Sequence, residues 1–517
     1  MAKRVRNVLI ALIALLLAVA GVPVVQELTE RSDAAPRRAA EATHGLRALS
    51  ARLELGNGPA IAVPRSFLGI STEYWSLARY ESTGKAFVRA VALLDAPGAG
   101  PVALRVGGFS ADESYWFPAH AQHPSWAYPI GRPWLSAASR LVRGLHARLI
   151  FNLGMMLQAP ALAASFAHAA LRMLPAGSIA AFELGNEPDL HGHSPLYEPA
   201  HIPHSSFWRV LRLQVRKPYV FKDYLADFTS YARALASVAP RVSLAGPALA
   251  LPVARRSWIG RLIAARPRAL AVITAHHYPL SKCQAPTARY YPSIERLLSP
   301  RSAQMSARFS RVVASVHRAR LRFVISELGA VTCGGARGVS DTFAAALWAP
   351  DMLFALLRAR VDAVYLHTRP LAYNGPFRLP HGRLGVWPVY YGVLMFSRAI
   401  ADHARLLPIR LSSARGLDLS AWALRNDKRA TVVVLINKGP RAARVRLALR
   451  RHGQALLERL LAPSVAVRRG ATFAGQSLGA DGRLHGRRRV QRLSPRAGGY
   501  SVEVPAYSAV LVRIPAR

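Results

Sequence analysis

Two glutamates stand where buried strands are predicted to end. Glu187 follows the apolar run at residues 180–184, and Glu327 follows the run at residues 322–326. Two carboxylates that face one pocket can share the cleavage of a glycosidic bond, because different surroundings keep one protonated and the other ionised. Asn186, directly before Glu187, can donate an amide hydrogen bond to a sugar hydroxyl. Either glutamate alone is also consistent with a helix cap, but the pair predicts glycosidase chemistry.

The elements that must position these glutamates are short apolar runs separated by helical patterns. Eight such runs are predicted as strands, at residues 66–70, 102–106, 149–153, 180–184, 242–245, 271–275, 322–326 and 363–366. Eight strands that alternate with helices are typical of a (β/α)8 barrel, whose reactive residues gather at the carboxyl ends of the strands. An open doubly wound sheet gives a similar alternation, but its glycine-rich phosphate motif is absent after the first run. We therefore expect an α/β fold with a TIM barrel over residues 59–397.

The pattern changes in the C-terminal part of the chain, residues 398–517. Apolar or alternating runs follow one another with no long helix between them, at residues 417–424, 430–437, 445–449, 456–461 and 500–514. This pattern predicts a C-terminal antiparallel β-sandwich domain. Residues 468–496 are basic and contain glycine, which favours a surface hairpin loop.

The N-terminus resembles a targeting segment. Basic residues precede an apolar run at residues 8–25, with a small-residue triplet at 18–20. Residues 1–25 are therefore predicted to be a signal peptide or an N-terminal membrane anchor, and residues 26–58 a linker that leads into the first strand. Both alternatives place the catalytic domain outside the cytoplasm: secreted, periplasmic, in the cell envelope, or anchored to the membrane.

The charge balance is strongly basic. The chain of 517 residues has 69 Lys and Arg against 27 Asp and Glu, a formal net charge of +42. Such an excess permits nucleic acid, an anionic polysaccharide or an anionic membrane as partner. The arginines are dispersed and mixed with alanine, so a compositional bias of the genome explains them equally well. We expect no nucleic acid partner, because no reading motif is present and export is predicted.

Several ordered motifs carry a resemblance to a known family. The Asn-Glu pair after the fourth run and the glutamate after the seventh resemble the retaining β-glycosidases of clan A. More closely, the sequence resembles glycoside hydrolase family 79, the heparanase and β-glucuronidase family, from about residue 60 to the C-terminus. The motifs are Gly69-Ile70-Ser71-Thr72-Glu73-Tyr74-Trp75, Arg105-Val106-Gly107-Gly108-Phe109-Ser110-Ala111-Asp112, Gly185-Asn186-Glu187-Pro188, His276-His277-Tyr278 and Ser326-Glu327.

The resemblance implies a role for each matching position. Glu187 matches the general acid/base and Glu327 the nucleophile of a double displacement with retention. Tyr278 matches the tyrosine whose hydroxyl binds the nucleophile in this clan. Ser110 and Asp112, after the second run, are candidates for binding sugar hydroxyls, although Asp112 is also placed to cap the next helix.

His276 and His277 raise the question of a metal site. Adjacent side chains on a strand point to opposite faces, so the two cannot ligate one ion from a regular strand. No carboxylate or cysteine at ligand spacing completes a site. We therefore expect no metal and no cofactor, and we take His276 to line the sugar pocket.

A glucuronide needs a partner for its carboxylate. Family members use the segment after the eighth strand, where backbone NH groups and a tyrosine hydroxyl meet this group. The corresponding segment here starts near Arg369 and contains Tyr373, Asn374 and Gly375, which we take as substrate-binding residues. Arg369 can add a positive charge, although a surface position is its commoner fate in a chain so rich in arginine.

The chain has two cysteines, Cys283 and Cys333, and neither has the spacing of a zinc or redox motif. In an exported protein such a pair favours a disulfide over two unrelated buried thiols. Cys283 follows the sixth run and Cys333 the seventh, so a barrel brings their loops together.

These observations predict an exported retaining β-glycoside hydrolase, acting on a glucuronide-containing glycan or glycoside in the manner of the β-glucuronidases and heparanases. An anionic polysaccharide is a possible partner, in view of the charge. Two alternatives stay open: a clan A β-glycosidase for a neutral sugar such as a glucoside or xyloside, and a catalytically silent carbohydrate-binding protein of the envelope.

Overall fold

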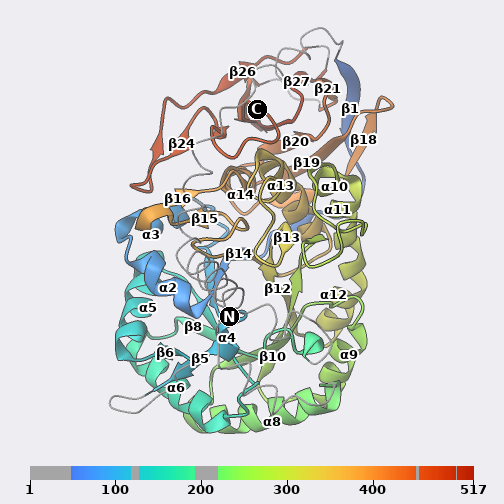
Figure 1. The fold of residues 1–517 in the computed structure, drawn as a ribbon. Helices are drawn as coiled ribbons and strands as arrows, with labels where there is room; N and C mark the ends of the chain where they lie inside the picture. Colours follow the sequence, from blue (N-terminus) through green and yellow to red (C-terminus); the bar gives the residue numbers. More distant parts are fainter. Residues whose placement is uncertain (1–47, 118–126, 192–218, 450–452, 497, 517) are drawn as a thin grey trace, which may run out of the picture. The chain divides into compact units, whose positions relative to one another are not determined.

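The computed structural model describes residues 48–117, 127–191, 219–449, 453–496 and 498–516 (Figure 1). The predicted signal or anchor at residues 1–25 lies outside the described residues, as does most of the predicted linker. Within the described ranges, no helix combines the length and hydrophobicity that a membrane crossing requires.

All eight strands predicted for the barrel are present, and they close a barrel of parallel strands. Going round it, each strand pairs with the next in the order β10, β12, β14, β3, β4, β7, β8 and β9. Their bounds are β3 Leu68–Thr72, β4 Ala103–Val106, β7 Leu149–Leu153, β8 Ile179–Leu184, β9 Ser243–Leu249, β10 Leu270–His277, β12 Arg322–Leu328 and β14 Ala363–Thr368. Because all eight run in the same direction, their carboxyl ends meet at one face of the barrel.

Helices surround this barrel (Figure 1). They are α2 Tyr74–Glu81, α3 Lys85–Ala92, α5 Arg132–Leu145, α6 Pro160–Met173, α8 Phe221–Val238, α9 Arg256–Ala265, α12 Phe309–Arg318, α13 Phe343–Arg358 and α14 Val389–Ala399. Shorter helices are α4 Ser110–Glu113, η3 Pro188–Leu190, α10 Ile294–Leu298, α11 Pro300–Gln304, η6 Met305–Arg308 and η7 Pro380–Gly382. Short strand pairs over the barrel are β5 Ser114–Trp116 with β6 Tyr128–Ile130, β11 Leu280–Ser281 with β13 Val331–Thr332, and β15 Phe377–Arg378 with β16 Gly385–Val386.

The C-terminal domain is a sandwich of two sheets. The larger has the order β2-β17-β19-β20-β28-β22-β23, with β26 also paired to β22, and the smaller has the order β18-β1-β21-β27. Bounds are β2 Ile61–Ala62, β17 Arg405–Leu407, β18 Ile409–Ser413, β19 Leu419–Arg425, β20 Thr431–Asn437, β21 Ala443–Leu447, β22 Ala455–Leu461, β23 Thr472–Phe473, β26 Gln491–Leu493, β27 Tyr500–Val504 and β28 Ser508–Ile514. The predicted insertion at 468–496 contains the hairpin β24 Ser477–Leu478 with β25 Leu484–His485.

Strand alternation explains how the large sheet serves two cores. Val433 and Leu435 of β20 pack with Val445 of the small sheet, in the core of the sandwich. Val432 and Val434, one residue along, point to the opposite face and pack in the core shared with the barrel helices. Successive side chains of a strand point to opposite faces, so one fully apolar strand covers both sides.

One predicted boundary differs from the structure. Residues 49–55, assigned to the linker, form strand β1 (Leu49–Leu55), which pairs with β18 and runs parallel to β21 in the C-terminal domain. Ala51 and Leu53 are buried in the sandwich core, which explains the alternating pattern of this segment. The chain therefore begins its described part in the sandwich, passes through the barrel and returns, and the sandwich is not purely antiparallel.

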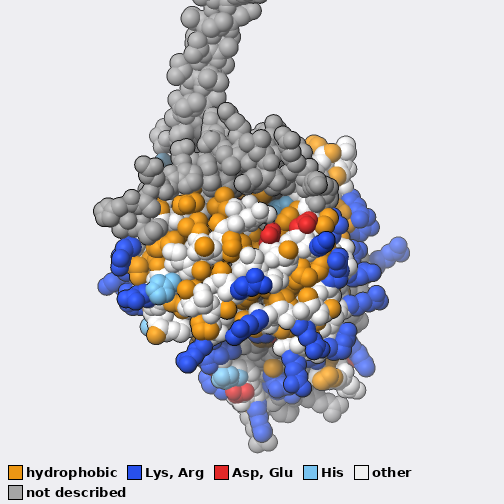
Figure 2. All heavy atoms as spheres, turned by 90° about the horizontal axis from the view of Figure 1, so that it is seen from below, with side chains coloured by type: hydrophobic (Ala, Val, Ile, Leu, Met, Phe, Trp, Pro, Cys, Tyr) orange, Lys and Arg blue, Asp and Glu red, His pale blue; other side chains and the backbone are white. Residues whose placement is uncertain are grey.

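The basic excess is spread over the surface. On the face seen in Figure 2, Lys and Arg side chains lie around an area of hydrophobic side chains, and acidic ones are few. This distribution agrees with the dispersal of arginine along the sequence.

Candidate active site

A tight turn at the end of β8 positions Glu187. Gly185 has a φ of 81°, a left-handed conformation that glycine adopts without strain, and Glu187 itself has a φ of 47°. The backbone NH of Glu187 donates to the carbonyl of Ala248 at 3.0 Å. Asp189, two residues on, accepts from the NH groups of Ala250 and Leu251 at 2.9 and 3.0 Å. These bonds tie the turn to the end of β9 and direct the Glu187 carboxylate into the cleft.

Glu327 lies near the carboxyl end of β12, and two side chains hold its carboxylate. The Arg105 guanidinium donates to Oε1 at 2.6 Å, and the Tyr278 hydroxyl donates to Oε2 at 2.9 Å. The side chain is only 8% exposed. Both oxygens of the predicted nucleophile are therefore engaged in one fixed orientation, with the tyrosine where the family resemblance implies it.

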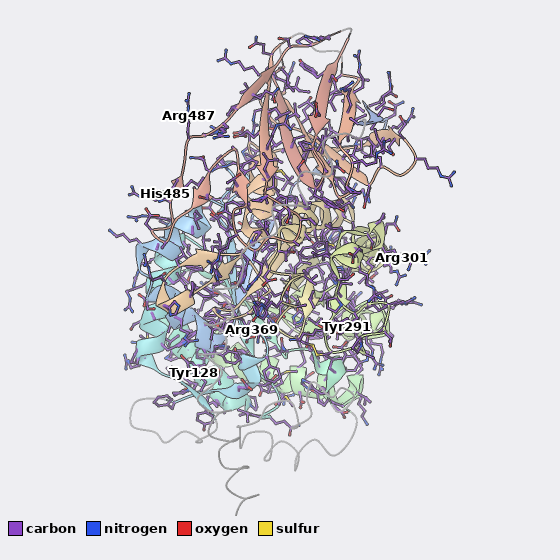
Figure 3. The ribbon with its side chains drawn as sticks, turned by 45° about the horizontal axis from the view of Figure 1, so that its top comes forward. Tyr128, Tyr291, Arg301, Arg369, His485 and Arg487 are labelled. Atoms are coloured by element: carbon purple, nitrogen blue, oxygen red, sulfur yellow. A yellow bond between two sulfur atoms is a disulfide. The ribbon has the colours of Figure 1, made fainter. Side chains whose placement is uncertain are left out.

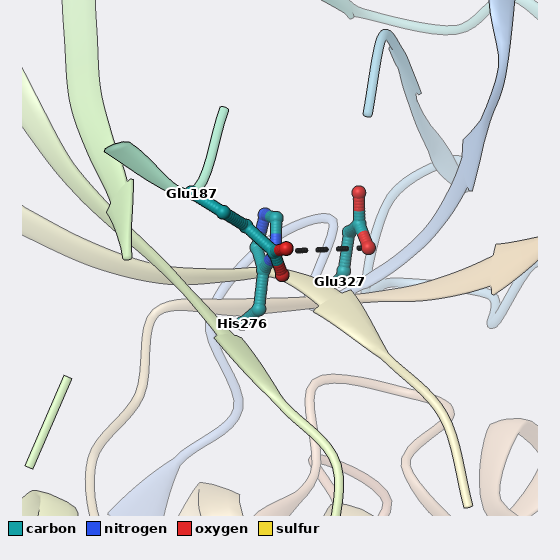
Figure 4. A group of neighbouring side chains, drawn as sticks. All are labelled: Glu187, His276 and Glu327. Carbon is teal, nitrogen blue, oxygen red and sulfur yellow. Dashed lines mark hydrogen bonds and ion pairs between the residues drawn. The ribbon is translucent and has the colours of Figure 1, made fainter. Parts of the chain in front are cut away.

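The two glutamates lie within reach of one glycosidic bond (Figure 4). A carboxylate oxygen of Glu187, one of Glu327 and a ring nitrogen of His276 all lie within 4.8 Å of one another. Carboxyl groups about 5–5.5 Å apart are typical of retaining glycosidases, whereas inverting enzymes need room for a water between them. The separation therefore matches double displacement.

The surroundings of Glu327 keep it ionised. Burial alone raises the pKa of a carboxyl group, but the positive charges of His276, His367 and Arg105 and the Tyr278 hydrogen bond outweigh it. The net effect holds the pKa of Glu327 below its ordinary value. A nucleophilic carboxylate must be ionised when the substrate arrives, and this environment provides that state.

His276 bridges the two carboxylates. Its Nδ1 lies 2.8 Å from Glu187 Oε1 and 3.6 Å from Glu327 Oε2. Burial lowers the pKa of a histidine, but the charge of Glu327 and the hydrogen bond to Glu187 reverse this effect and raise the pKa of His276. His276 lines the cleft, and its neighbour His277, which also lines it, packs edge-on against Phe309.

The same three side chains offer donor atoms that a metal ion could use. Glu327, however, already carries the Arg105 guanidinium at 2.6 Å, and a cation bound to this carboxylate would meet that positive charge. The donor set therefore fits the proton chemistry of a glycosidase better than it fits a metal site.

Arg105 is the residue whose role the sequence did not reveal. It lies on β4, is completely buried, and donates to Glu183, Glu327, Ser71 and Asn186 at 2.7, 2.6, 3.1 and 3.2 Å. Two carboxylates raise its pKa despite burial. One guanidinium thus orients both Glu327 and Asn186, the residue before Glu187. The only sequence signal was its place at the start of a motif that begins within the second apolar run.

Glu187 and Glu327 line one cleft of about 950 Å³ at this face. The other acidic, histidine and arginine side chains that line it are Glu73, His276, His277, Arg308, His367 and Arg369. A cleft of this volume suits a ligand of one or two sugar rings. Glu73, which the sequence placed in a motif without a role, lies 3.3 Å from His367 through its carboxylate.

Other predicted substrate-binding residues divide into two groups. Asn374 lines the cleft, but its side chain already bonds the backbone of Ala330 and Val331. Tyr373 and Gly375 lie outside the cleft lining, and Tyr373 packs on Trp387 instead. The Tyr373 NH bonds the carbonyl of Gly334, which anchors this part of the loop.

Ser110 and Asp112 also lie outside the cleft lining and serve the scaffold. The Ser110 hydroxyl accepts from the NH of Tyr74, and Asp112 accepts from the NH of Met156. Burial raises the pKa of Asp112 to about 7. Asn186, in contrast, lines the cleft beside Glu187 as expected.

The predicted disulfide is present between Cys283 and Cys333. It joins the loops that follow β11 and β13, which are paired in parallel above β10 and β12. Both cysteines line the cleft, so the bridge braces the rim next to Glu327.

Comparisons with known proteins agree with this architecture. Residues 417–511 match the Glycosyl hydrolase family 79 C-terminal beta domain. A search of curated proteins finds no match to the sequence. The structure is similar to a 4-O-alpha-L-rhamnosyl-beta-D-glucuronidase from Fusarium oxysporum 12S, with a TM-score of 0.70 and 19% identity over 90% of this chain and 100% of that chain.

Two further solved structures are similar at lower identity. The GH51 arabinofuranosidase from Xanthomonas axonopodis pv. citri gives a TM-score of 0.62 and 13% identity over 90% of this chain and 100% of that chain. A Paenibacillus polymyxa xyloglucanase from GH family 44 gives a TM-score of 0.56 and 11% identity over 91% of this chain and 100% of that chain. At such identities the likeness shows the fold. Residues 417–511 thus match a domain of the glycoside hydrolase family 79 type, and the barrel with its sandwich has a fold shared with known glycosidases.

Proposed function

We propose that the protein is a retaining β-glycosidase that releases a β-linked glucuronic acid residue. The observation that carries the proposal is the pair Glu187 and Glu327, whose carboxylate oxygens lie within 4.8 Å across one cleft. The two groups have different surroundings, since Glu327 is held by Arg105 and Tyr278 whereas Glu187 is bonded only through His276 among the side chains described.

The first step forms a glycosyl-enzyme. Glu327 attacks the anomeric carbon with its ionised carboxylate, while Glu187 donates a proton to the glycosidic oxygen and the leaving group departs as an alcohol. Arg105 and Tyr278 hold the attacking oxygen in place, so little orientation is lost on approach.

The second step releases the sugar. Glu187, now a carboxylate, takes a proton from a water molecule that attacks the same carbon, and the bond to Glu327 breaks. Two inversions at one carbon give retention of configuration. The arrangement needs no cofactor for either step.

Arg369 supports the choice of a uronic acid. It follows β14, lines the cleft and is half-buried, and its Nη2 lies against the backbone of Gly334. Among the described residues it has no hydrogen bond or ion pair with a side chain, so the guanidinium is free to meet a carboxylate. In the view of Figure 3, Arg369 lies near the middle of the molecule, whereas Tyr128 and Arg301 lie nearer its edges. Arginine binds a carboxylate through two parallel hydrogen bonds, which a neutral sugar cannot reciprocate.

Export of the enzyme is part of the proposal. The disulfide between Cys283 and Cys333 supports it, because disulfides persist in oxidising compartments. The N-terminal segment that would direct export lies outside the described residues. An anionic polysaccharide that carries the glucuronide stays a possible partner in view of the +42 charge.

The test compares aryl β-D-glucuronide, β-D-glucoside and β-D-xyloside with the wild-type enzyme and a Glu327→Gln control. Turnover of the glucuronide alone, lost in the control, supports the proposal. A Glu187→Gln variant should keep activity on a glucuronide with a strongly acidic phenol, and added azide should accelerate it and yield the β-configured glycosyl azide.

Arg369→Gln separates sugar specificity from chemistry. We expect its kcat/KM for the glucuronide to fall by roughly tenfold or more, with no matching loss on a neutral sugar, because a charge-assisted hydrogen bond contributes about 1.5–3 kcal/mol. Turnover of a neutral sugar by the wild-type enzyme would instead leave the proposed roles of the two glutamates intact and refute the specificity for a uronic acid. No turnover on any substrate would favour the silent carbohydrate-binding protein.

A further inference from the structure

The cleft has two chemically unlike halves. Glu73 follows β3, His367 lies near the end of β14, and Arg369 follows β14; these two strands are neighbours in the barrel. They make this half charged and suited to the hydroxyls and carboxylate of a sugar. The half that follows β8, β9 and β10, three consecutive strands of the barrel, has a different composition.

This second half presents an apolar surface. We define the apolar wall as the cleft-lining residues Leu190, Leu251, Pro252, Val253, Pro279 and Met305. Leu251 is 49% exposed and lines the cleft, so a ligand there can contact its side chain. The polar side chains Ser281, Gln284, Tyr290 and Arg308 also line this side, and all four come from the segment between β10 and α12. The lining residues 250–254, which follow β9, are apolar throughout.

Backbone hydrogen bonds place the apolar wall beside the acid. Asp189 binds the NH groups of Ala250 and Leu251 from the turn that carries Glu187. The NH of Glu187 bonds Ala248 at the end of the same strand. The wall therefore adjoins the carboxyl group that must protonate the glycosidic oxygen.

The position of the apolar wall beside Glu187 indicates which part of the substrate contacts it. A general acid lies next to the oxygen it protonates, and the leaving group is attached to that oxygen. The leaving group must therefore extend along the apolar wall, away from the charged half that holds the sugar. A further sugar ring there would turn hydroxyls toward Leu251, Pro252 and Val253, whose side chains offer no hydrogen bonds, and this costs binding free energy.

We infer that the natural substrates of this enzyme are glycosides whose leaving group is an apolar alcohol or phenol, bound by the apolar wall. The inference rests on the proposed function only in taking Glu187 as the acid. It narrows the substrate class from glucuronide-containing glycans and glycosides to glycosides of hydrophobic aglycones.

The experiment uses alkyl β-D-glucuronides of increasing length, from methyl to octyl, with the full-length enzyme. Alkyl alcohols have similar acidity, so chain length changes contact with the apolar wall and leaves the chemistry constant. Each buried methylene is expected to raise kcat/KM by about fourfold until the wall is covered. A flat series, or faster cleavage when a second sugar replaces the alkyl group, overturns the inference.

Two variants test whether the rise of kcat/KM with alkyl chain length comes from the apolar wall. Leu251→Ser should lower the octyl-to-methyl ratio of kcat/KM by roughly tenfold, because one large apolar contact is lost. Val490→Ser, a matched change at an exposed valine of the C-terminal domain, should leave the ratio unchanged. Equal ratios in both variants and the wild type would remove the wall from the explanation.

A binding measurement keeps the two proposals apart. The affinity of the Glu327→Gln variant for methyl and octyl β-D-glucuronide, and for the corresponding glucosides, is measured by calorimetry. Affinity that rises with chain length supports the apolar wall even if the enzyme prefers the glucosides. In that case only the proposed specificity for a uronic acid is refuted. Affinity independent of chain length for both sugars refutes the inference while leaving the glycosidase chemistry intact.

Discussion

The Tyr278 hydroxyl is the contact on Glu327 that can be removed most cleanly, by a Tyr278→Phe substitution. This hydroxyl donates to Glu327 Oε2 at 2.9 Å. A hydrogen bond to a charged group contributes about 1.5–3 kcal/mol, and one pKa unit corresponds to about 1.4 kcal/mol. Removing the bond should therefore raise the pKa of Glu327 by roughly 1–2 units.

Loss of this hydrogen bond should shift the acid side of the pH–activity profile to higher pH. The pKa of Glu327 is held low in the wild type, so the nucleophile stays ionised down to acidic pH. In Tyr278→Phe the carboxylate protonates earlier as the pH falls, and the acid limb of kcat/KM should move to higher pH by the same 1–2 units. Burial and the charges of His276, His367 and Arg105 stay in place.

The assay measures kcat/KM for an aryl β-D-glucuronide between about pH 3 and pH 9 for the wild type, Tyr278→Phe and Tyr291→Phe. Tyr291 lies outside the cleft lining and serves as the matched control for the loss of a phenol hydroxyl (Figure 3). An acid limb that stays in place in Tyr278→Phe would refute the claim that this hydroxyl stabilises the ionised nucleophile.

Three further outcomes concern stability. Arg105→Met should destabilise the protein by about 3–5 kcal/mol in urea unfolding, because Glu183 keeps a buried charge without its partner, and Glu183→Gln in the same chain should restore part of the loss. Replacing both Cys283 and Cys333 with serine should lower the melting temperature, with a loss of up to about 4 kcal/mol for a loop of 50 residues; an unchanged melting temperature contradicts this. Burial lowers the pKa of His277 to about 4, so the unfolded chain binds a proton first and stability should fall by up to about 3 kcal/mol between about pH 6.5 and pH 4; a His277→Gln variant that shows the same fall contradicts this assignment.

The barrel and the convergence of its two glutamates could be predicted from the amino-acid sequence. All eight strands were visible because each is a short apolar run buried on both faces, bounded by polar or turn-forming residues. Parallel strands bring their carboxyl ends to one face, so Glu187 and Glu327 had to converge once their places after the fourth and seventh strands were known. The disulfide followed from the same adjacency of loops.

The side chains that surround this pair could be identified only in the folded structure. Arg105 reads locally as a charged residue in an apolar run, and its use depends on Glu183 and Glu327, which are distant in the sequence. Tyr373 could not be placed either, because its contacts with Gly334 and Trp387 join residues that are apart in the sequence; Arg369 lines the cleft instead.

Long-range pairing also decided the domain boundary. Strand β1 lies beside β21, a partner from the other end of the chain, and nothing in its own seven residues names that partner. Local patterns record whether a segment is buried, since burial selects residue types one by one. They do not record which distant segment covers it, because many apolar surfaces satisfy the same pattern.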